Sequence, residues 1–518
     1  MGWEGFSPRV IKGVAKELSG SLSRLYNSCM REGYYPGDFK IARVVPVFKA
    51  EDPTEFSNYR PVSVLPVLSQ LFERVIQKRL VHFLDRNKVT IPGQYGFRAG
   101  HSTAMAVLDM VEKVRGAWGR GNIALGVFID LKKAFDTVDH EILLDKLEHY
   151  GIRGTAQGLL RSYLSKRSQY VTYGGYESER GEIECGVPQG SVLGPLFFLL
   201  YVNDMVKAAK GLDLVLFADD TNIFIEGKNS DELVKRINEG LEGISRWFRC
   251  NRLTLNLKKT EYIHFRSPGS RNIPQLGSLR MGGEQIRKVN GARFLGVWVD
   301  DELKWTEHIE KVRTKISQLL GVVGRAKSVL GGNSLHKLYN GLVLPHIQYC
   351  LLVWGGFEQG RNLTKGRALL SYQKKLVGMI EGKGDRYHAD PLFAKHGILK
   401  IGDLYKHQVR THAWKFWNGC LPENQAEMFR KVSDVHGYST RSAESGISRG
   451  ADHKSLSYVV PKEWSTLPEE LRARKSQSAF KKQSKKQILR QYEEFRCVGG
   501  CGVCSSEIES SQGGHAES

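Results

Sequence analysis

Two short apolar runs separated by a polar segment constrain this chain more than any other part of its sequence. Residues 214–217 and 223–225 are apolar, with the β-branched and aromatic side chains typical of strands, and the polar residues 218–222 between them are typical of a turn. The pattern predicts a β-hairpin that carries the adjacent carboxylates of Asp219 and Asp220 at its tip.

The two adjacent carboxylates need an explanation, because like charges held this close repel each other and a hairpin does not require them. A divalent cation bound beside them would remove the repulsion. Asp220 is also an ordinary turn-forming residue. The hairpin alone therefore leaves a metal site and a plain turn as open alternatives.

A second strand that ends in a carboxylate favours the metal site. Residues 124–129 form an apolar run typical of a buried strand, and Asp130 follows it directly. By itself, Asp130 is more typical of a helix cap or a loop residue. If the strands are neighbours, three carboxylates converge, and such oxygen ligands suit Mg²⁺. Two ions about 4 Å apart stabilise both the attacking and the leaving oxygen of a phosphoryl transfer.

The net charge indicates a polyanionic partner. The chain has 76 Lys and Arg against 55 Asp and Glu, a formal charge of +21, and nucleic acid is the commonest polyanion that such a surplus attracts. Scattered solubilising lysines are the alternative. A membrane surface fits less well, because no basic amphipathic helix stands out.

Cysteine content and hydropathy predict the compartment. Of the 8 cysteines, five are widely scattered, which indicates free thiols in a reducing interior. Residues 1–7 show no signal peptide, and the longest apolar stretch, near residues 192–202, is too short to span a bilayer. We predict an intracellular protein of the nucleus, the cytoplasm or both, without a membrane segment.

Apolar periodicity predicts long helices around these strands. Helical spacing covers residues 67–84, 307–324 and 334–349, and Ser102 and Asp139 are placed to cap two further helices. Strands mixed with long helices indicate an α+β fold.

Seven short motifs follow one another along the chain. They are NYRPVS at 58–63, QYGFR at 94–98 with HST at 101–103, IDLKKAFD at 129–136, GVPQGSVLGP at 186–195, FADD at 217–220, LNLKKT at 255–260 and FLGV at 294–297. In this order and spacing they resemble the motifs of the reverse transcriptases of non-LTR (LINE-type) retrotransposons, close to the jockey-like group. The similarity runs from about residue 7 to residue 482, and WSTLP at 464–468 resembles the family's C-terminal segment.

This resemblance implies an α+β right-hand polymerase with fingers, a palm with an antiparallel sheet and a helical thumb, followed by a mainly helical C-terminal region. The expected parts are an N-terminal extension (1–55), fingers and palm (56–300), a thumb-like helical region (301–400), a basic C-terminal region (401–496) and a disordered tail (497–518). The implied activity is RNA-directed DNA polymerisation from a primer 3′ hydroxyl, with an RNA template, dNTPs and a DNA primer or target as partners.

The resemblance also implies the metal ligands. Asp130 and Asp219 would hold two Mg²⁺ ions, which Mn²⁺ would be able to replace, and the Leu131 carbonyl would be a further ligand. Asp220 would be a secondary, partly structural carboxylate. Lys132 stands where the family often has a small residue, a change that a solvent-facing loop should tolerate.

The same resemblance assigns residues to the nucleotide and the primer. Phe135 takes the position of the family's steric gate, where a bulky ring clashes with a 2′-hydroxyl, and simple core packing is the alternative. The other nucleotide-binding candidates are Lys49, Arg60, Gln189 and Gly190, and the primer-contact candidates are Phe294, Leu295 and Gly296. Lys259 is the candidate general acid for pyrophosphate, with Lys258 as its rival.

The C-terminal residues allow weaker predictions. Cys497, Cys501 and Cys504, with His515, would be able to bind Zn²⁺, but their spacing differs from the family's zinc knuckle, and we expect a disordered tail. The basic stretch at residues 471–490 is predicted to be either a nuclear signal or an RNA-binding face.

Several rival interpretations stay open at this point. Another reverse transcriptase, such as an intron maturase or a telomerase, fits less well with the block around Arg60. The other rivals are an interaction protein derived from such an element and a catalytically silent nucleic-acid-binding relic, which the complete set of expected acidic residues disfavours. No ribonuclease H motif follows residue 300. The residues ahead of Asn58 leave no room for the endonuclease that family members usually carry, so we expect a polymerase that cannot cut DNA.

Overall fold

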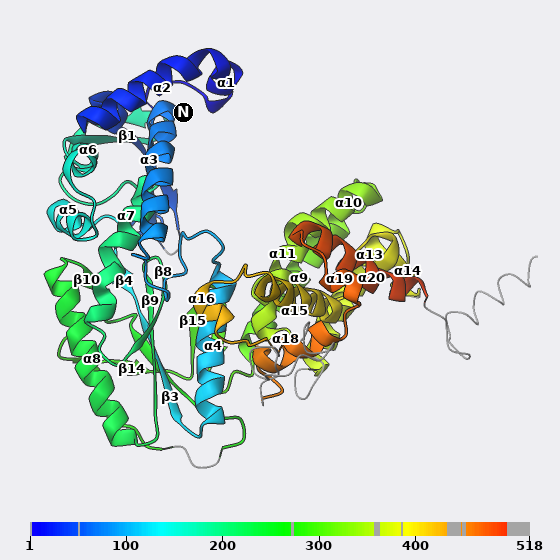
Figure 1. The fold of residues 1–518 in the computed structure, drawn as a ribbon. Coiled ribbons are helices and arrows are strands. Elements are labelled where there is room, and N and C mark those ends of the chain that lie inside the picture. The colour runs from blue at the N-terminus through cyan, green and yellow to red at the C-terminus, as the bar shows by residue number, and fades with distance from the viewer. Residues whose placement is uncertain are drawn as a thin grey trace, which may run out of the picture. The chain divides into compact units, whose positions relative to one another are not determined.

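The chain folds into two compact units, each with its own core. The structure, a computed structural model, describes residues 3–49, 52–270, 274–356, 363–384, 387–431, 447 and 452–494. Unit 1 contains Met1–His101, Ile123–Tyr262 and Asn272–Val289, and unit 2 contains Ser102–Asn122, Ile263–Arg271 and Asn290–Ser518. Figure 1 shows strands mixed with helices over about the first 300 residues and mainly helices after them. The α+β class expected from the sequence is confirmed.

Unit 1 combines two five-stranded β-sheets and two short two-stranded ones with the helices that cover them. Its helices are α1 (Pro8–Gly13), α2 (Ala15–Glu32), η1 (Gly37–Lys40), η2 (Phe56–Asn58), α3 (Val67–Arg86), α5 (His140–His149), α6 (Gly154–Leu164), α7 (Leu193–Val202), η3 (Asn203–Lys207) and α8 (Ser230–Cys250). Its strands are β1 (Ile41–Phe48), β2 (Tyr59–Val64), β3 (Ile123–Ile129), β4 (Leu131–Lys132), β5 (Arg167–Tyr173), β6 (Tyr176–Glu177), β7 (Gly181–Ile183), β8 (Asp213–Phe217), β9 (Asp220–Gly227), β10 (Thr254–Leu255), β12 (Arg280–Met281), β13 (Glu284–Gln285) and β14 (Arg287–Lys288). Strand β11 (Glu261–Phe265) begins in this unit.

The central sheet of unit 1 has the strand order β14-β11-β3-β9-β8. Strands β3 and β9 are antiparallel, with Ile129 opposite Thr221, and β8 and β9 form a hairpin with Phe217 opposite Asp220. Helix α8 packs against β9 and lies along this sheet in Figure 1. The predicted hairpin and the predicted neighbouring strand are thereby confirmed, and the residue that follows Ile129 is Asp130.

The hairpin turn is shorter than its sequence suggests. The polar run 218–222 was expected to form the whole turn, but only Ala218 and Asp219 lie between the strands. Thr221 and Asn222 belong to β9 and are buried. Asn222 can be buried because its Nδ2 donates to the Val215 carbonyl across the hairpin at 3.4 Å.

The second sheet of unit 1 has the order β2-β1-β5-β6, with β7 also paired to β5. Strands β1 and β2 are antiparallel, and Val47 lies opposite Arg60. The Lys49 backbone N–H donates to the Asn58 carbonyl at 2.9 Å and closes this ladder just beyond β1. Two predicted nucleotide-binding cations, Lys49 and Arg60, therefore lie at the same end of one strand pair.

The core of unit 1 surrounds α7, whose residues are almost all buried. This helix accounts for the longest apolar stretch of the sequence, and it packs on α3 and α5. Its first turn is held by the buried carboxylate of Glu73, which accepts hydrogen bonds from the backbone N–H groups of Val192 at 2.7 Å and Leu193 at 2.9 Å. A carboxylate at this end satisfies otherwise unpaired N–H groups and complements the helix dipole.

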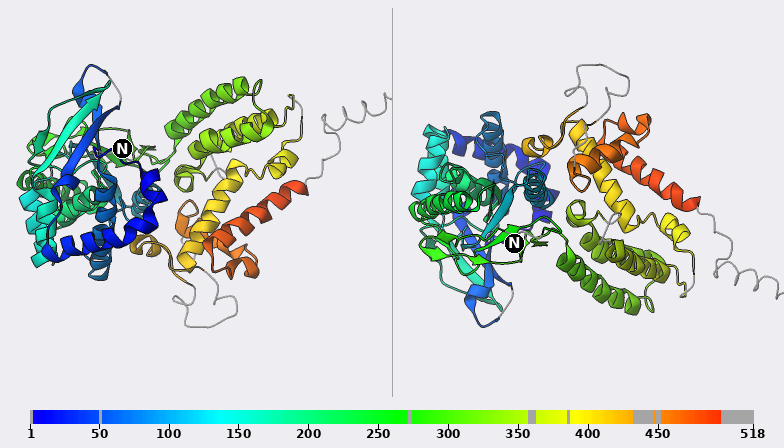
Figure 2. Two further views of the ribbon diagram at one scale, coloured as in Figure 1. Left: turned by 90° about the horizontal axis from the view of Figure 1, so that it is seen from above. Right: turned by 90° about the horizontal axis from the view of Figure 1, so that it is seen from below.

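Unit 2 is mainly helical in the part of the chain that the structure describes. Its helices are α4 (Thr103–Gly119), α9 (Thr306–Ala326), α10 (Gly332–Leu338), η4 (Tyr339–Val343), α11 (Leu344–Gln348), α12 (Leu351–Trp354), α13 (Leu363–Ile380), α14 (Ala389–Lys395), α15 (Ile401–Trp417), α16 (Glu423–Ala426), α18 (Leu456–Ser465), α19 (Glu469–Arg472) and α20 (Gln477–Glu493). Strands β15 (Gly291–Phe294) and β16 (Val297–Asp300) form a hairpin. Figure 2 shows α15 and α20 running side by side, and the two helices are in contact.

Most helices expected from the sequence are confirmed. Residues 67–84 lie in α3 and residues 307–324 in α9. The Ser102 Oγ accepts from the Met105 N–H at the start of α4, and the Asp139 carboxylate accepts from the Ile142 N–H at the start of α5. These helix caps could be predicted from the sequence because each capping contact spans only three residues.

The single helix expected at residues 334–349 is interrupted. The chain forms α10, then a π-helical turn from Tyr339 to Val343, and then α11. Pro345 lies at the start of α11 and has no backbone N–H to donate to a carbonyl one turn earlier. A proline in this position therefore accounts for the break in the α-helical hydrogen-bond pattern.

The finer division into thumb-like and C-terminal regions stays a prediction. The tail expected at residues 497–518, with Cys497, Cys501, Cys504 and His515, lies outside the described residues. Within the described residues, no helix is both long enough and apolar enough to cross a membrane.

Candidate active site

The turn that presents the two adjacent carboxylates is tight and strained. Ala218 has a φ of 56° and is buried, and Asp219 follows it as the second residue of the turn. A positive φ at the first turn position matches the right-handed twist of the strands but is unfavourable for a residue with a Cβ. Strain of this kind persists where neighbouring structure holds the turn in place.

The segment at residues 93–96 holds the turn. The Leu216 N–H donates to the Gly93 carbonyl at 2.9 Å, and the Tyr95 N–H donates to the Leu216 carbonyl at 2.8 Å. The buried Gln94 side chain accepts through Oε1 from the Gly96 N–H at 2.8 Å and the Ala218 N–H at 3.1 Å. The motif QYGFR thus forms an edge against β8.

Gly96 allows this close approach. A Cβ at that position would lie 2.4 Å from the Ala218 nitrogen, a distance that no side chain can tolerate. The glycine of the motif is therefore required by the turn that carries Asp219.

Asp130 lies beside this turn and is held by Asn256. The Asn256 Nδ2 donates to Asp130 Oδ2 at 2.7 Å, and the Asn256 backbone N–H donates to the Asp130 carbonyl at 2.9 Å. Strands β4 and β10 pair next to this contact, with Leu131 opposite Leu255. The motif LNLKKT therefore supports the motif IDLKKAFD, which contains Asp130, through its asparagine.

The carboxylates influence one another electrostatically. Desolvation, together with the charges of Asp219 and Asp130, raises the pKa of Asp220 to about 6. Desolvation and the charge of Asp130 also raise the pKa of Asp219, while Arg60 and Lys49 oppose the shift. Because both side chains remain exposed to solvent, their desolvation is only partial, and the repulsion among the carboxylates is the part that a bound cation would cancel.

The donor chemistry at this end of the sheet fits Mg²⁺, which prefers carboxylate oxygens and completes its shell with water and phosphate. The three carboxylates do not form a finished cage: among the described residues, no group of three or more His, Cys, Asp and Glu side chains is arranged to hold a metal ion. The hydrogen bond from Asn256 engages one oxygen of Asp130. The ligand roles of Asp130, Leu131, Asp219 and Asp220 stay predictions.

Lys49 and Arg60 are exposed cations within electrostatic reach of these carboxylates, since both lower the pKa of Asp219. Neither makes an ion pair with another described residue. Their charges are therefore free for an anionic ligand, which agrees with the expected triphosphate contact.

Phe135 lies between two other aromatic rings. Its ring stacks on the buried ring of Phe198, with centroids 4.5 Å apart, and meets the exposed ring of Phe97 edge-on at 6.4 Å. Phe135 is itself half-buried. One side of the ring thus contributes to the core while part of it stays accessible, so the steric-gate role and the packing role are compatible.

The turn at Pro188–Gly190 is bound to the rest of unit 1 at two points. The Gln189 Nε2 donates to Asp136 Oδ1 at 2.7 Å, and the Gln189 carbonyl accepts from the Ser63 N–H at 2.7 Å. Gly190 has a φ of 130°, and a Cβ there would lie 2.3 Å from the Ser63 carbonyl oxygen. The close backbone approach that Gly190 allows is thus to β2, and its role in binding a nucleotide stays a prediction.

The remaining predicted residues lie on other segments. Lys258 and Lys259 are both exposed in the turn after β10, and the Lys259 N–H donates to the Asn256 carbonyl. In unit 2, Leu295 and Gly296 form the β15–β16 turn, with φ of 46° and 82°. The Phe294 side chain is buried, so the accessible part of the predicted primer contact is the turn itself.

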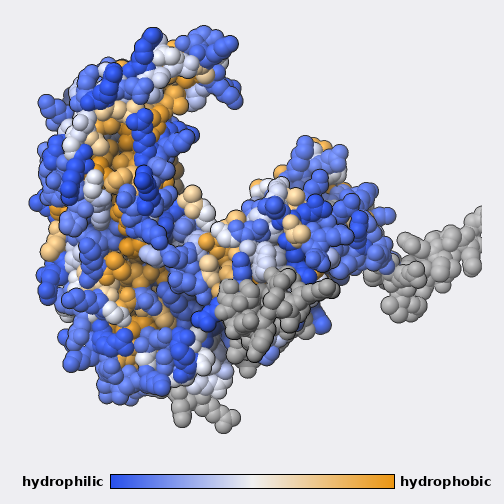
Figure 3. Space-filling view, viewed as in Figure 1, coloured by the Kyte–Doolittle hydropathy of each residue, from blue (hydrophilic) through white to orange (hydrophobic). Residues whose placement is uncertain are grey.

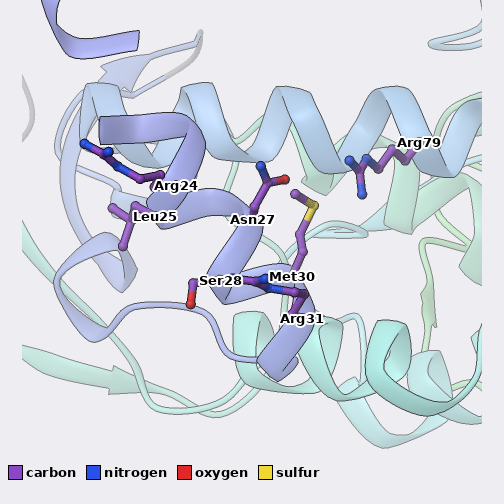
Figure 4. Close-up of a pocket in the computed structure, with 7 residues that line it drawn as sticks. All are labelled: Arg24, Leu25, Asn27, Ser28, Met30, Arg31 and Arg79. Atoms are coloured by element: carbon purple, nitrogen blue, oxygen red, sulfur yellow. The ribbon is translucent and has the colours of Figure 1, made fainter. Parts of the chain in front are cut away.

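A hollow of about 840 Å³ lies between α2 and α3, and none of the predicted site residues lines it. Figure 4 shows Arg24, Asn27, Ser28 and Arg31 on α2 and Arg79 on α3 around it. None of the residues that line this hollow belongs to the carboxylate site.

Three residues that support the site were missed by sequence reasoning. Gln94, Asn256 and Asp136 each make a side-chain hydrogen bond to a motif that carries a predicted catalytic or nucleotide-binding residue. All three residues stand inside motifs that had been quoted for their resemblance. Within each motif, the signal that points to the residue is a polar side chain to which no role had been assigned.

The match to a known protein family includes the residues of this site. Residues 49–299 match the family described as "Reverse transcriptase (RNA-dependent DNA polymerase)". This range contains the central sheet of unit 1 and all three carboxylates. Over these residues, just under half of the chain, the sequence matches that of a reverse transcriptase domain.

The curated relatives are polymerases of non-LTR retrotransposons. The chain is 28% identical over 419 residues to the probable RNA-directed DNA polymerase from transposon X-element of Drosophila melanogaster, covering 78% of this chain and 44% of the relative. It is 28% identical over 407 residues to the RNA-directed DNA polymerase from mobile element jockey of the same species, covering 76% and 43%. The chain thus spans less than half the length of these relatives.

Among solved structures, the chain is similar to apo telomerase from Candida tropicalis, with 13% identity and a TM-score of 0.41 over 75% of this chain and 67% of that one. A TM-score this low carries no argument. The similarity to reverse transcriptases depends on the family match and the sheet topology.

Proposed function

We propose that the protein is an RNA-directed DNA polymerase that copies RNA into DNA from a primer 3′ hydroxyl. The support is the register of β3, β8 and β9, which brings Asp130, Asp219 and Asp220 to one end of one sheet. The relatives named as RNA-directed DNA polymerases add to this support.

The carboxylates would bind two divalent metal ions, with Asp130 and Asp219 as shared ligands and Asp220 and the Leu131 carbonyl as further ones. When bound, such ions would stabilise the attacking 3′ oxygen and the leaving pyrophosphate oxygen. Mg²⁺ is the proposed ion, and Mn²⁺ would be able to replace it. Asn256 would keep Asp130 directed toward Asp219 through the hydrogen bond to Oδ2.

The other residues would bind and select the substrate. Lys49 and Arg60 would donate hydrogen bonds to the triphosphate. The accessible part of Phe135 would exclude a ribose 2′-hydroxyl, and the turn carrying Gln189 and Gly190 would face the templating base pair. Lys259 would give a proton to pyrophosphate, and the turn at Leu295 and Gly296 would contact the primer.

The proposed partners follow from this reaction. They are an RNA template, a DNA primer or target and dNTPs, and the net charge of +21 suits polyanions of this kind. A protein that acts on such partners would work in the nucleus, the cytoplasm or both.

A primer-extension assay tests the proposal. The purified full chain is given a DNA primer annealed to an RNA template, with dNTPs and Mg²⁺, and a reaction without template is the control. We expect DNA that extends to the end of the template. Tight binding of the primer–template without any extension would contradict the proposal and would instead indicate a catalytically silent nucleic-acid-binding relic.

A further inference from the structure

Helix α20 (Gln477–Glu493) carries five cations on its surface. Lys481, Lys482, Lys485, Lys486 and Arg490 are all exposed, and the first acidic residue of the helix is Glu493. At about 1.5 Å per residue, the cations cover about 14 Å of helix length. We call this set of five residues the α20 basic face.

The opposite side of α20 is fixed to the fold. Phe480, Ser484, Ile488 and Tyr492 recur at every fourth position and are buried. Helix α20 packs on α14 and α15, and Figure 2 shows α20 lying beside α15.

Specific contacts hold both ends of this buried side. Near the first turn, the Phe480 ring lies 6.0 Å from the Trp414 ring and 6.4 Å from the Trp464 ring. Near the last turn, the Tyr492 hydroxyl donates to the Asp403 carboxylate and accepts from the Lys400 N–H at 3.2 Å. The helix is therefore anchored along its length, and the cations are displayed in a fixed arrangement.

The cations of the α20 basic face have no carboxylate partner among the described residues. Five neighbouring positive charges without counter-charges repel one another, which costs stability in the free protein. In the view of Figure 3, the surface over α14 and α20 is hydrophilic.

The neighbouring helix α15 adds to this positive surface. Desolvation and the charge of Lys481 lower the pKa of Lys415, and desolvation with the charges of Lys485, Lys481 and Arg410 lowers the pKa of His407 to about 4. Burial is the larger cause of both shifts, and the smaller contribution of Lys481 and Lys485 shows that these cations lie close to α15.

We propose that the α20 basic face binds the phosphate backbone of a nucleic acid. A row of exposed cations on an anchored helix, with no carboxylate of α20 before Glu493, matches the regular negative charge of a phosphodiester chain. The contact is made to phosphates, so it would add affinity for RNA or DNA of any sequence. This binding is independent of the carboxylate chemistry in unit 1.

Two other occupants of this face fit less well. A helix that binds a lipid surface inserts an apolar side into it, but the apolar side of α20 is already buried against α14 and α15. A basic peptide signal is read by a receptor that grips the chain, whereas this segment is packed as a helix along its length.

The test compares two triple variants of the full chain. The α20 variant is Lys482→Gln, Lys486→Gln and Arg490→Gln. The control variant is Lys235→Gln, Arg236→Gln and Arg246→Gln on α8, where Asp231, Glu232, Glu239 and Glu242 are interspersed with the cations. Both variants lose three charges at exposed positions, so they separate the local face from the net charge.

Binding is measured by fluorescence anisotropy without dNTPs and in EDTA, so that catalysis does not affect the result. The probes are a single-stranded RNA, an RNA–DNA duplex and a DNA duplex, each over a salt range of about 50 to 200 mM. Loss of affinity for one probe alone would identify the kind of nucleic acid that the α20 basic face binds. Equal loss for all three probes would indicate a general contact with the phosphate backbone.

We expect the α20 variant to bind more weakly and to depend less on salt than the control. The slope of log K against log salt on single-stranded RNA should fall in magnitude by up to about 2, since each lost phosphate contact contributes about 0.7. A variant with Lys482→Arg and Lys486→Arg should bind like the unchanged chain.

Two results would overturn the proposal. One is a salt slope and affinity of the α20 variant equal to those of the α8 control on every probe. The other is a variant that still binds all three nucleic acids normally but no longer sediments with phosphatidylserine vesicles. Thermal unfolding of both variants verifies that the fold is retained.

Discussion

Asn256 holds Asp130 at two points: its side-chain amide donates to the carboxylate at 2.7 Å and its backbone N–H donates to the carbonyl at 2.9 Å. The Asn256 carbonyl in turn accepts from the N–H groups of Lys259 and Thr260, which fixes the turn after β10. The orientation of a carboxylate in the proposed metal site thus depends on a neutral amide from a distant motif.

Replacing Asn256 with alanine should weaken metal use more than substrate binding. The Asp130 carboxylate loses the group that orients it, and removal of such a supporting hydrogen bond typically costs about 10–100-fold in metal affinity or activity. We expect the Mg²⁺ concentration for half-maximal extension to rise, while the KM for dNTP at saturating metal changes little. Mn²⁺ binding followed by electron paramagnetic resonance should weaken as well.

Thr254→Ala is the matched control for this prediction, because Thr254 is exposed on the short strand β10 that directly precedes Asn256. Equal metal dependence in the Asn256 and Thr254 variants would mean that the contact to Asp130 has no functional role.

The raised pKa of Asp220 predicts how stability changes with pH. Burial and the charges of Asp219 and Asp130 raise this pKa from 3.8 to about 6. The folded chain therefore binds the proton more tightly than the unfolded chain, so the Asp220 contribution to the free energy of unfolding falls as the pH rises through this range. In EDTA, Asp220→Asn should raise the Tm relative to the unchanged chain more at about pH 7.5 than at about pH 5.

Mg²⁺ should reduce this advantage of Asp220→Asn at the higher pH, because a bound cation cancels the same repulsion. Asp213→Asn, at the other end of β8, serves as the control. A Tm difference that is the same at both pH values would show that Asp220 has no raised pKa.

The side chain of Gln94 should be essential for the stability of the carboxylate turn. Gln94→Ala leaves the N–H groups of Gly96 and Ala218 without their acceptor, and each buried donor left in this way costs about 1–3 kcal/mol. We expect the free energy of unfolding in urea to fall by about 2–4 kcal/mol. Gln70→Ala, which removes one hydrogen bond to the Leu65 carbonyl, should cost clearly less, and equal losses would contradict this account of the turn.

Phe135 should control the choice between deoxynucleotides and ribonucleotides. Phe135→Ala removes a ring that stacks on Phe198, so we expect a lower Tm and a smaller preference for dNTP over rNTP in kcat/KM. Phe97→Ala tests the exposed neighbouring ring, whose loss should affect the core less. If Phe135→Ala keeps its activity and its sugar preference, the ring serves the core alone.

Local signals made much of the fold predictable from the sequence. The caps at Ser102 and Asp139 and the apolar strands around Asp130 and Asp219 depend on residues that are near in sequence, so their patterns are visible in the chain itself. The contacts of Gln94 with Ala218 and of Asn256 with Asp130 join residues 124 and 126 positions apart. Nothing in the local sequence identifies which distant group such an amide will meet.

Other features could not be predicted, because their sequence patterns were compatible with more than one local structure. The run at 218–222 was expected to be a turn, yet buried hydrogen bonding places Thr221 and Asn222 in β9. The basic stretch at 471–490 was a charge pattern alone, whereas α20 separates its exposed cations from a buried side that contains Phe480 and Ile488.

The rate of single-nucleotide addition to a DNA primer on an RNA template tests the central claim most directly. Asp130→Ala and Asp219→Asn should abolish addition, because each removes a proposed shared ligand of two metal ions, and both should keep their affinity for the primer–template, whose phosphates are bound elsewhere. Asp213→Asn should add nucleotides at the rate of the unchanged chain. If either Asp130→Ala or Asp219→Asn added nucleotides as fast as Asp213→Asn, these carboxylates would not be the catalytic centre.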